Sequence, residues 1–133
     1  MLTEDQIVKL LTAYLRTRGF KIIMELTSIQ KGIDVIAKAP DGMCHYIEVK
    51  GETSGRITSK RYGKPFNPNQ IWSHVSVALM KTVTDMNSKD AGNGKFGMAF
   101  PENHRALLQT IKPSLDILGI IVYLVSEKGV VVL

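Results

Sequence analysis

The chain has 133 residues, of which 44% are hydrophobic and 22% are charged, and this composition is typical of one globular domain with a single core. No apolar run approaches the roughly 20 residues of a membrane-spanning helix, and the N-terminus lacks the basic and apolar regions of a signal peptide. The only cysteine, Cys44, excludes an internal disulfide and fits a reducing cytoplasm. We therefore predict one domain, residues 1–133, that is cytoplasmic and does not act at a membrane.

The formal net charge of +5 is concentrated in one segment. Residues 53–84 contain five of the 17 basic residues and no Asp or Glu, while the other 12 basic residues balance the 12 acidic residues of the chain. A clustered positive segment favours a polyanionic ligand such as nucleic acid, and the alternative is a solvated loop and helix face. Four of these basic residues are expected to bind phosphates: Arg56, Lys60, Arg61 and Lys64.

The first predicted element is a helix from Thr3 to about Gly19. Thr3 and Gln6 fit a capping box at its start, and Gly19 suits its C-terminal end. Apolar residues at helical spacing form the stripe that should face the core: Ile7, Leu10, Leu11, Tyr14 and Leu15.

Three strands should follow this helix. Residues 20–26 form the first, and residues 32–36 and 46–51 form a hairpin around the turn residues 40–42. The next residues, 51–66, are a long polar loop, and loops of this length in a compact domain are usually functional.

A second helix is predicted from Asn67, which suits the N-cap, to about Met86, with Pro68 at the first helical position. Trp72 is expected to belong to the core because it lies in this helix among apolar residues.

The remaining elements complete an α/β pattern. We expect a strand at residues 96–100, a helix from Pro101 to Leu118 that Pro113 bends, and two strands at residues 120–125 and 130–133. The predicted order is α-β-β-β-α-β-α-β-β, which indicates a central mixed sheet flanked by helices.

Two acidic residues and a lysine should meet on one face of the predicted hairpin. Side chains alternate along a strand, so Glu48 and Lys50 point the same way, and the hairpin brings Asp34 beside them. Magnesium is typically held by one or two carboxylates, waters and substrate phosphate. Asp34 and Glu48 could supply those carboxylates, and the backbone carbonyl of Val49 could add an oxygen. A surface ion pair between Glu48 and Lys50 is the structural alternative.

Two further residues are candidates for this site. On a helical wheel Glu4 lies near the apolar stripe of the first helix, so it could reach the metal, although an acid at the positive helix end is also explained by the helix dipole. Gln70 could contact the phosphate, although it also fits a capping box with Asn67. His74, one turn later, is interpreted as a partly buried structural histidine.

The segments Gly32-Ile33-Asp34 and Ile47-Glu48-Val49-Lys50-Gly51, together with the two helices that flank them, resemble the PD-(D/E)XK nuclease superfamily. The resemblance spans about residues 3–86. It implies a restriction-endonuclease-like α/β sandwich.

The resemblance also implies a role for each matching residue. Asp34 and Glu48 would bind the metal, Lys50 would be the catalytic lysine, and Glu4 would match the first-helix acid of many members. Gln70 looks like the glutamine that many members place on the helix after the Glu-x-Lys strand. Two positions depart from the family. Ile33 stands where the family name has proline, and His74 stands where some resolvase-like members have tyrosine.

These features predict a Mg²⁺-dependent endonuclease, in which Mn²⁺ can substitute, acting on DNA in preference to RNA in repair, recombination or restriction. A homodimer, paired through the apolar edge at residues 130–133, would let two sites act on opposite strands. The alternative is a non-catalytic nucleic-acid-binding module, or a subunit of a larger complex, that keeps the nuclease fold.

Overall fold

The computed structural model describes residues 1–26, 32–51, 67–88 and 93–133 of the chain. Within these ranges it contains three α-helices, one short 3-10 helix and one six-stranded sheet. The elements are α1 (Glu4–Thr17), β1 (Lys21–Glu25), β2 (Val35–Lys38), β3 (Cys44–Val49), α2 (Pro68–Met86), β4 (Lys95–Pro101), η1 (Glu102–His104), α3 (Arg105–Leu118), β5 (Ile120–Ser126) and β6 (Gly129–Val132).

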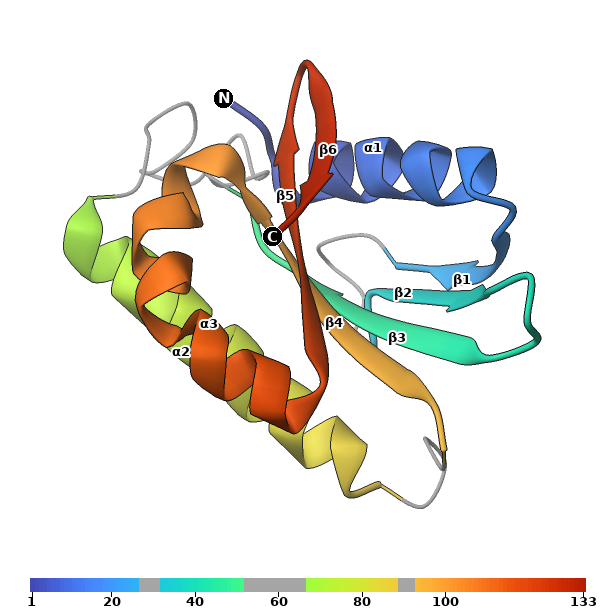
Figure 1. Ribbon diagram of the computed structural model, residues 1–133. Coiled ribbons are helices and arrows are strands. Elements are labelled where there is room, and N and C mark those ends of the chain that lie inside the picture. The colour runs from blue at the N-terminus through green and yellow to red at the C-terminus, as the bar shows by residue number, and fades with distance from the viewer. Residues whose placement is uncertain (27–31, 52–66, 89–92) are drawn as a thin grey trace.

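The six strands lie in sequence order in one mixed sheet (Figure 1). The β1–β2, β2–β3 and β5–β6 pairs are antiparallel, whereas β3, β4 and β5 run parallel to one another. The prediction of an α/β fold around a mixed sheet is confirmed. Because β3, β4 and β5 are parallel, their C-terminal ends meet at one edge of the sheet.

Helices cover both faces of this sheet. α1 packs on one face, and α2 and α3 pack on the other (Figure 1). Strand β5 shows the alternation that serves two cores, because Tyr123 and Val125 face the α1 cluster while Val122 and Leu124 face the α2–α3 cluster. Each fully buried Leu or Val side chain contributes about 1.5–3 kcal/mol to folding.

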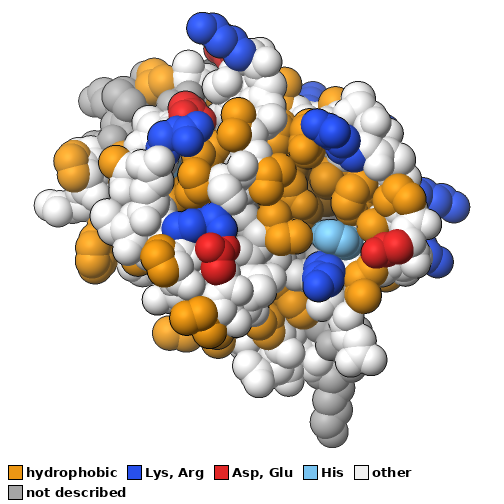
Figure 2. Space-filling model, viewed as in Figure 1, with side chains coloured by type: hydrophobic (Ala, Val, Ile, Leu, Met, Phe, Trp, Pro, Cys, Tyr) orange, Lys and Arg blue, Asp and Glu red, His pale blue; other side chains and the backbone are white. Residues whose placement is uncertain are grey.

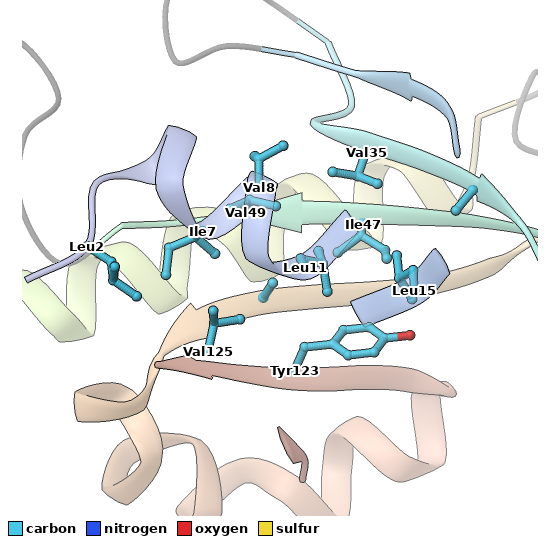
Figure 3. Close-up of a cluster of buried hydrophobic side chains, with 12 residues drawn as sticks. Leu2, Ile7, Val8, Leu11, Leu15, Val35, Ile47, Val49, Tyr123 and Val125 are labelled. Atoms are coloured by element: carbon cyan, nitrogen blue, oxygen red, sulfur yellow. The ribbon is translucent and has the colours of Figure 1, made fainter. Parts of the chain in front are cut away.

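The apolar stripe of α1 is the one predicted from its spacing. Ile7, Leu11 and Leu15 are at most 1% exposed. Figure 3 shows them directed toward Ile47 and Val49 of β3. These β3 contacts fix which face of the strand is buried against α1, and so which face carries Glu48.

Both predicted capping boxes are present. Thr3 N donates to Gln6 Oε1 over 2.8 Å, and Gln6 N donates to Thr3 Oγ1 over 3.3 Å. At α2, Asn67 N donates to Gln70 Oε1 over 2.7 Å, and Gln70 N donates to Asn67 Oδ1 over 2.9 Å. Such caps satisfy backbone donors that a helix leaves without partners, and each is worth about 1 kcal/mol.

Three local predictions are wrong. Pro101 ends β4 rather than starting a helix, because its backbone is extended (φ −59°, ψ 153°), and α3 begins only at Arg105 after η1. Asp34 lies just before β2 instead of inside it. Trp72 is 64% exposed, because α2 buries a face formed by Val75, Ala78 and Thr82.

One face of the molecule carries both basic and hydrophobic side chains (Figure 2). Among the described residues visible in Figure 2, Lys and Arg side chains are scattered around hydrophobic side chains that gather near the middle of this face. None of the helices in the described ranges is long and apolar enough to cross a membrane.

Candidate active site

Asp34 and Glu48 lie side by side where β2 begins and β3 ends. The strands pair with Val35 opposite Ile47, so the next positions along the ladder are Asp34 and Glu48. Ile47 and Val49 are buried against α1, which directs Glu48 to the opposite face, toward α2. The predicted convergence of the hairpin acids is therefore present.

Both carboxyl groups are almost completely removed from solvent. Asp34 is 7% exposed and Glu48 is 4% exposed. Asp34 Oδ2 accepts a hydrogen bond from Val49 N over 2.8 Å, which fixes the orientation of this carboxyl group. Buried acids are rare unless they are paired or bind a cation, so two of them in one place are a candidate functional site.

Two lysines approach the same oxygen of Glu48. Lys50 Nζ lies 3.9 Å from Glu48 Oε1, as expected for side chains two residues apart on a strand. Lys81 Nζ, from α2, lies closer, at 3.3 Å. The Glu48 carboxylate in turn raises the pKa of Lys81.

Glu4 joins the acids through a close approach of α1 to the end of β3. A Cβ atom on Gly51 would lie 2.5 Å from the Glu4 backbone nitrogen, so only glycine fits here. Burial, followed by repulsion from Asp34, raises the pKa of Glu4 to about 7. The electrostatic interaction of Glu4 with Asp34 places the two acids near each other, and the role of Glu4 at a metal stays a prediction.

The acids interact strongly with one another. Burial and then the charge of Asp34 raise the pKa of Glu48 to about 7, although Lys81 and Lys50 oppose this rise. Burial also raises the pKa of Asp34, against the Val49 hydrogen bond and the Lys50 charge. We use the name acid cluster for Glu4, Asp34 and Glu48. At neutral pH this cluster favours any added positive charge, either a proton or a cation.

The donor chemistry of the acid cluster fits a hard divalent cation. Within the described residues no three His, Cys, Asp or Glu side chains form a ready-made metal cage. Magnesium does not need one, because it keeps several waters and uses one or two carboxylates together with substrate phosphate. Asp34 and Glu48 provide two such carboxylates, and the predicted use of the Val49 carbonyl remains a prediction.

Gln70 and His74 lie on the helix that faces this site. The side-chain oxygen of Gln70 accepts a hydrogen bond from Asn67 N in the cap. A catalytic contact of Gln70 would therefore use its side-chain nitrogen, Nε2, or break the cap. His74 is partly buried, as interpreted from the sequence, and its ring hydrogen-bonds the backbone of Gly51. Burial, and then Lys50, lowers the pKa of His74 to about 4, so it is neutral at pH 7.

A second histidine, which sequence reasoning did not single out, packs against His74. His104 is fully buried, its ring centroid lies 5.9 Å from that of His74, and it stacks on Phe100. Its Nδ1 lies 2.7 Å from Asn103 Oδ1. Burial, and then His74, lowers the pKa of His104 to about 4, so both histidines are neutral at pH 7.

Lys81 is the site residue that sequence reasoning missed. It was counted within the positive segment but given no role. Its position was readable, because it lies seven residues after His74 and 11 after Gln70, which places all three on one side of a helix. The predicted phosphate-binding residues, Arg56, Lys60, Arg61 and Lys64, lie outside the described residues.

Comparison with solved structures finds a similar fold in an FdxN element excision controlling factor protein from Anabaena variabilis, with a TM-score of 0.56. The similarity covers 94% of this chain and 91% of that chain, at 14% sequence identity, and therefore concerns the fold alone. No family model matches the chain, and no curated protein matches its sequence.

Proposed function

We propose that this protein is a metal-dependent nuclease that hydrolyses phosphodiester bonds, and that it acts as an endonuclease on DNA. The observation that carries this proposal is the buried pair Asp34 and Glu48 with Lys50 and Lys81 at the Glu48 oxygen. Phosphodiester hydrolysis needs carboxylates for a cation and a positive group near the phosphate, and this pair of strands carries both.

The burial of the acids argues against a purely structural role. Replacing buried ion pairs by apolar residues is often neutral or stabilising, so such groups are weak contributors to folding. Here the pKa values of Glu4 and Glu48 are raised to about 7, which means that their charged forms are disfavoured in the absence of further positive charge. A bound divalent cation would stabilise these charged forms against both burial and the repulsion from Asp34.

Each residue has a defined part in the proposed reaction. Asp34 and Glu48 would hold Mg²⁺ or Mn²⁺, with Glu4 and the Val49 carbonyl as further oxygen donors. When bound, such an ion polarises a phosphoryl oxygen and lowers the pKa of a bound water. Lys50 orients the attacking water and balances charge on the phosphate. Gln70 remains a candidate contact to the phosphate.

The same proposal includes the finer fold and the substrate. The layers of helices about a mixed sheet are compatible with a restriction-endonuclease-like sandwich. A role in DNA repair, recombination or restriction is part of the same proposal. DNA contacts are proposed for the basic residues of the segment 51–66.

A homodimer is part of this proposal. β6 is an edge strand of the sheet, and Val131 and Val132 are about half exposed there. Pairing of two such edges would align two sites for the two strands of a duplex.

The experiment is a cleavage panel of labelled duplex, flap, junction and single-stranded DNA, together with RNA, in Mg²⁺, Mn²⁺ or EDTA. We expect metal-dependent cleavage of a DNA substrate by the wild type and a loss of about 100-fold or more in Asp34→Asn. The matched control is Asp41→Asn. Asp41 also accepts a backbone hydrogen bond of 2.8 Å, from Met43, but it lies in an exposed turn, so its variant should cleave normally.

Absence of metal-dependent cleavage of every substrate by the wild type would overturn the enzymatic proposal. Salt-sensitive DNA binding without cleavage would favour the second candidate, a non-catalytic nucleic-acid-binding module or complex subunit. The contacts of Lys50 and Lys81 with Glu48 favour that candidate, because they already neutralise much of the Glu48 charge.

A further inference from the structure

We propose that Lys81 is a displaceable cation. It holds Glu48 in the metal-free protein, leaves when a divalent ion binds the acid cluster, and then contacts a non-bridging oxygen of the substrate phosphodiester. This inference rests on the proposed function and assigns a role to a residue to which the sequence motifs assign none.

The geometry separates the two lysines that meet Glu48. Lys81 Nζ is the nearer of the two to Glu48 Oε1, at 3.3 Å against 3.9 Å for Lys50. The side chain of Lys81 is 54% exposed, whereas that of Lys50 is 15% exposed. Because the side chain of Lys81 is more than half exposed, water can replace Glu48 as its partner at less cost than for Lys50. Lys81 is therefore the lysine that can leave.

Counting charges explains why one lysine should leave. Counted formally, the three carboxylates of the acid cluster and the two ammonium groups at Glu48 give the site a charge of −1 in the absence of metal. A divalent ion changes this to +1. The charges that surround Lys81 itself then sum to zero instead of −2, so the net attraction that holds Lys81 at Glu48 is lost. A phosphodiester carries one negative charge, and its arrival restores neutrality while it offers Lys81 a new partner.

The placement of Lys81 fits this second partner. It lies on α2, which packs on the opposite face of the sheet from α1, so it reaches Glu48 from a different helix than Glu4 does. Its flexible four-carbon stem allows the ammonium group to swing away from Glu48 while it stays close to the site. A phosphate bound at Asp34 and Glu48 would lie within reach of this ammonium group.

The first test is a calorimetric titration with Mn²⁺ at pH 8 in the absence of DNA. Lys81→Met removes the ammonium group and keeps the apolar stem, so we expect Mn²⁺ to bind on the order of threefold more tightly or better. The matched control is Lys112→Met, because Lys112 also forms a helix-surface ion pair, with Asp116, but lies on α3. That variant should bind Mn²⁺ like the wild type.

The second test is the salt dependence of DNA binding, measured by anisotropy with and without Ca²⁺, which is used in place of Mn²⁺ to slow cleavage. With Ca²⁺ we expect Lys81→Met to reduce the slope of log K against log salt by about one charge. In EDTA the slope should be unchanged, because Lys81 is then engaged with Glu48. Lys81→Arg keeps the charge and should preserve the wild-type slope.

The outcomes separate the two proposals. If the wild type binds Mn²⁺ but Lys81→Met binds it equally or more weakly, the displaceable role of Lys81 is overturned while the metal site stands. If the salt slope changes equally in Ca²⁺ and EDTA, Lys81 is a permanent DNA contact and the proposed exchange is wrong. If the wild type binds no Mn²⁺, both the metal site and this role of Lys81 are refuted.

Discussion

At the scale of single residues, the site depends on groups whose protonation is shifted by burial in opposite directions. Glu4 and Glu48 have pKa values raised to about 7, while those of His74 and His104 are lowered to about 4. Because their pKa values are raised, Glu4 and Glu48 contribute stability that is fully present below about pH 4.5 and is lost as the pH rises to about 7. The lowered histidines destabilise the fold as pH falls from about 6.5 to 4, so the two effects largely offset each other in the wild type.

The difference in stability between Glu4→Gln and the wild type isolates the contribution of the Glu4 carboxyl group. Glu4→Gln removes the carboxyl group, so in EDTA its stability relative to the wild type should rise by about 1–2 kcal/mol between pH 4.5 and pH 7. The histidine contributions are common to both proteins and cancel. Urea unfolding at a series of pH values measures this. A difference that stays constant with pH would show that Glu4 is not coupled to the acid cluster.

The residue scale is also where sequence reasoning succeeded best. The shared direction of Glu48 and Lys50 follows from strand alternation alone, and the neighbourhood of Asp34 follows from the hairpin turn. Helical spacing places Lys81 on the same side of α2 as Gln70 and His74. Its contact with Glu48, like the contacts of His104, depends on how α2 and η1 pack against the sheet. The capping role of Gln70 was readable from the sequence, but a phosphate contact was equally compatible with it.

At the scale of elements, the meeting of α1 with the end of β3 places Glu4. The backbone of Gly51 packs directly against the backbone of Thr3 and Glu4. This junction joins the N-terminal helix to the strand that carries Glu48 and Lys50. Sequence patterns predicted the two elements and their caps, but not the contact between them, which arises from tertiary packing.

We expect Gly51→Ala to damage the site more than the fold. Its new Cβ would lie 2.5 Å from Glu4 N and 2.9 Å from Thr3 C, and backbone atoms cannot move aside without shifting α1. Overpacking of this kind costs about 1–3 kcal/mol. Mn²⁺ affinity should fall together with stability, as measured by titration and urea unfolding.

Gly97→Ala provides the matched comparison. Its Cβ would lie 3.0 Å from Ile121 O and 3.2 Å from Tyr123 Cε2, on the face of the sheet that packs against α1. Its nearest atoms do not include the Glu4 or Thr3 backbone, so it should destabilise the protein while Mn²⁺ affinity is kept. Equal loss of affinity in both variants would mean that the Gly51 junction has no special role in positioning Glu4.

At the scale of the whole molecule, β3, β4 and β5 run parallel, so their C-terminal ends lie along the same end of the sheet. The acid cluster lies at the C-terminal end of β3. A cavity of about 590 Å³ lies at the β4 and β5 ends, lined by Glu102, Asn103, Val125 and Ser126 among others, and contains no member of the acid cluster. The α/β class and the mixed sheet could be predicted from alternating patterns and turns. The start of α3 and the exposure of Trp72 could not, because Pro101 extends β4 and the buried face of α2 is chosen by its packing on the sheet.

The central claim is that Asp34 and Glu48 together bind one divalent cation. The most direct measurement is calorimetric titration of the wild type and Asp34→Asn with Mn²⁺ at pH 6.5, repeated in two buffers of different ionisation enthalpy. Because the pKa of Glu48 is about 7, metal binding at this pH should release protons into the buffer. We predict one bound ion with proton release in the wild type, and binding weakened by about tenfold or more in Asp34→Asn. Equal affinity in the two proteins, or no binding to either, would contradict the account.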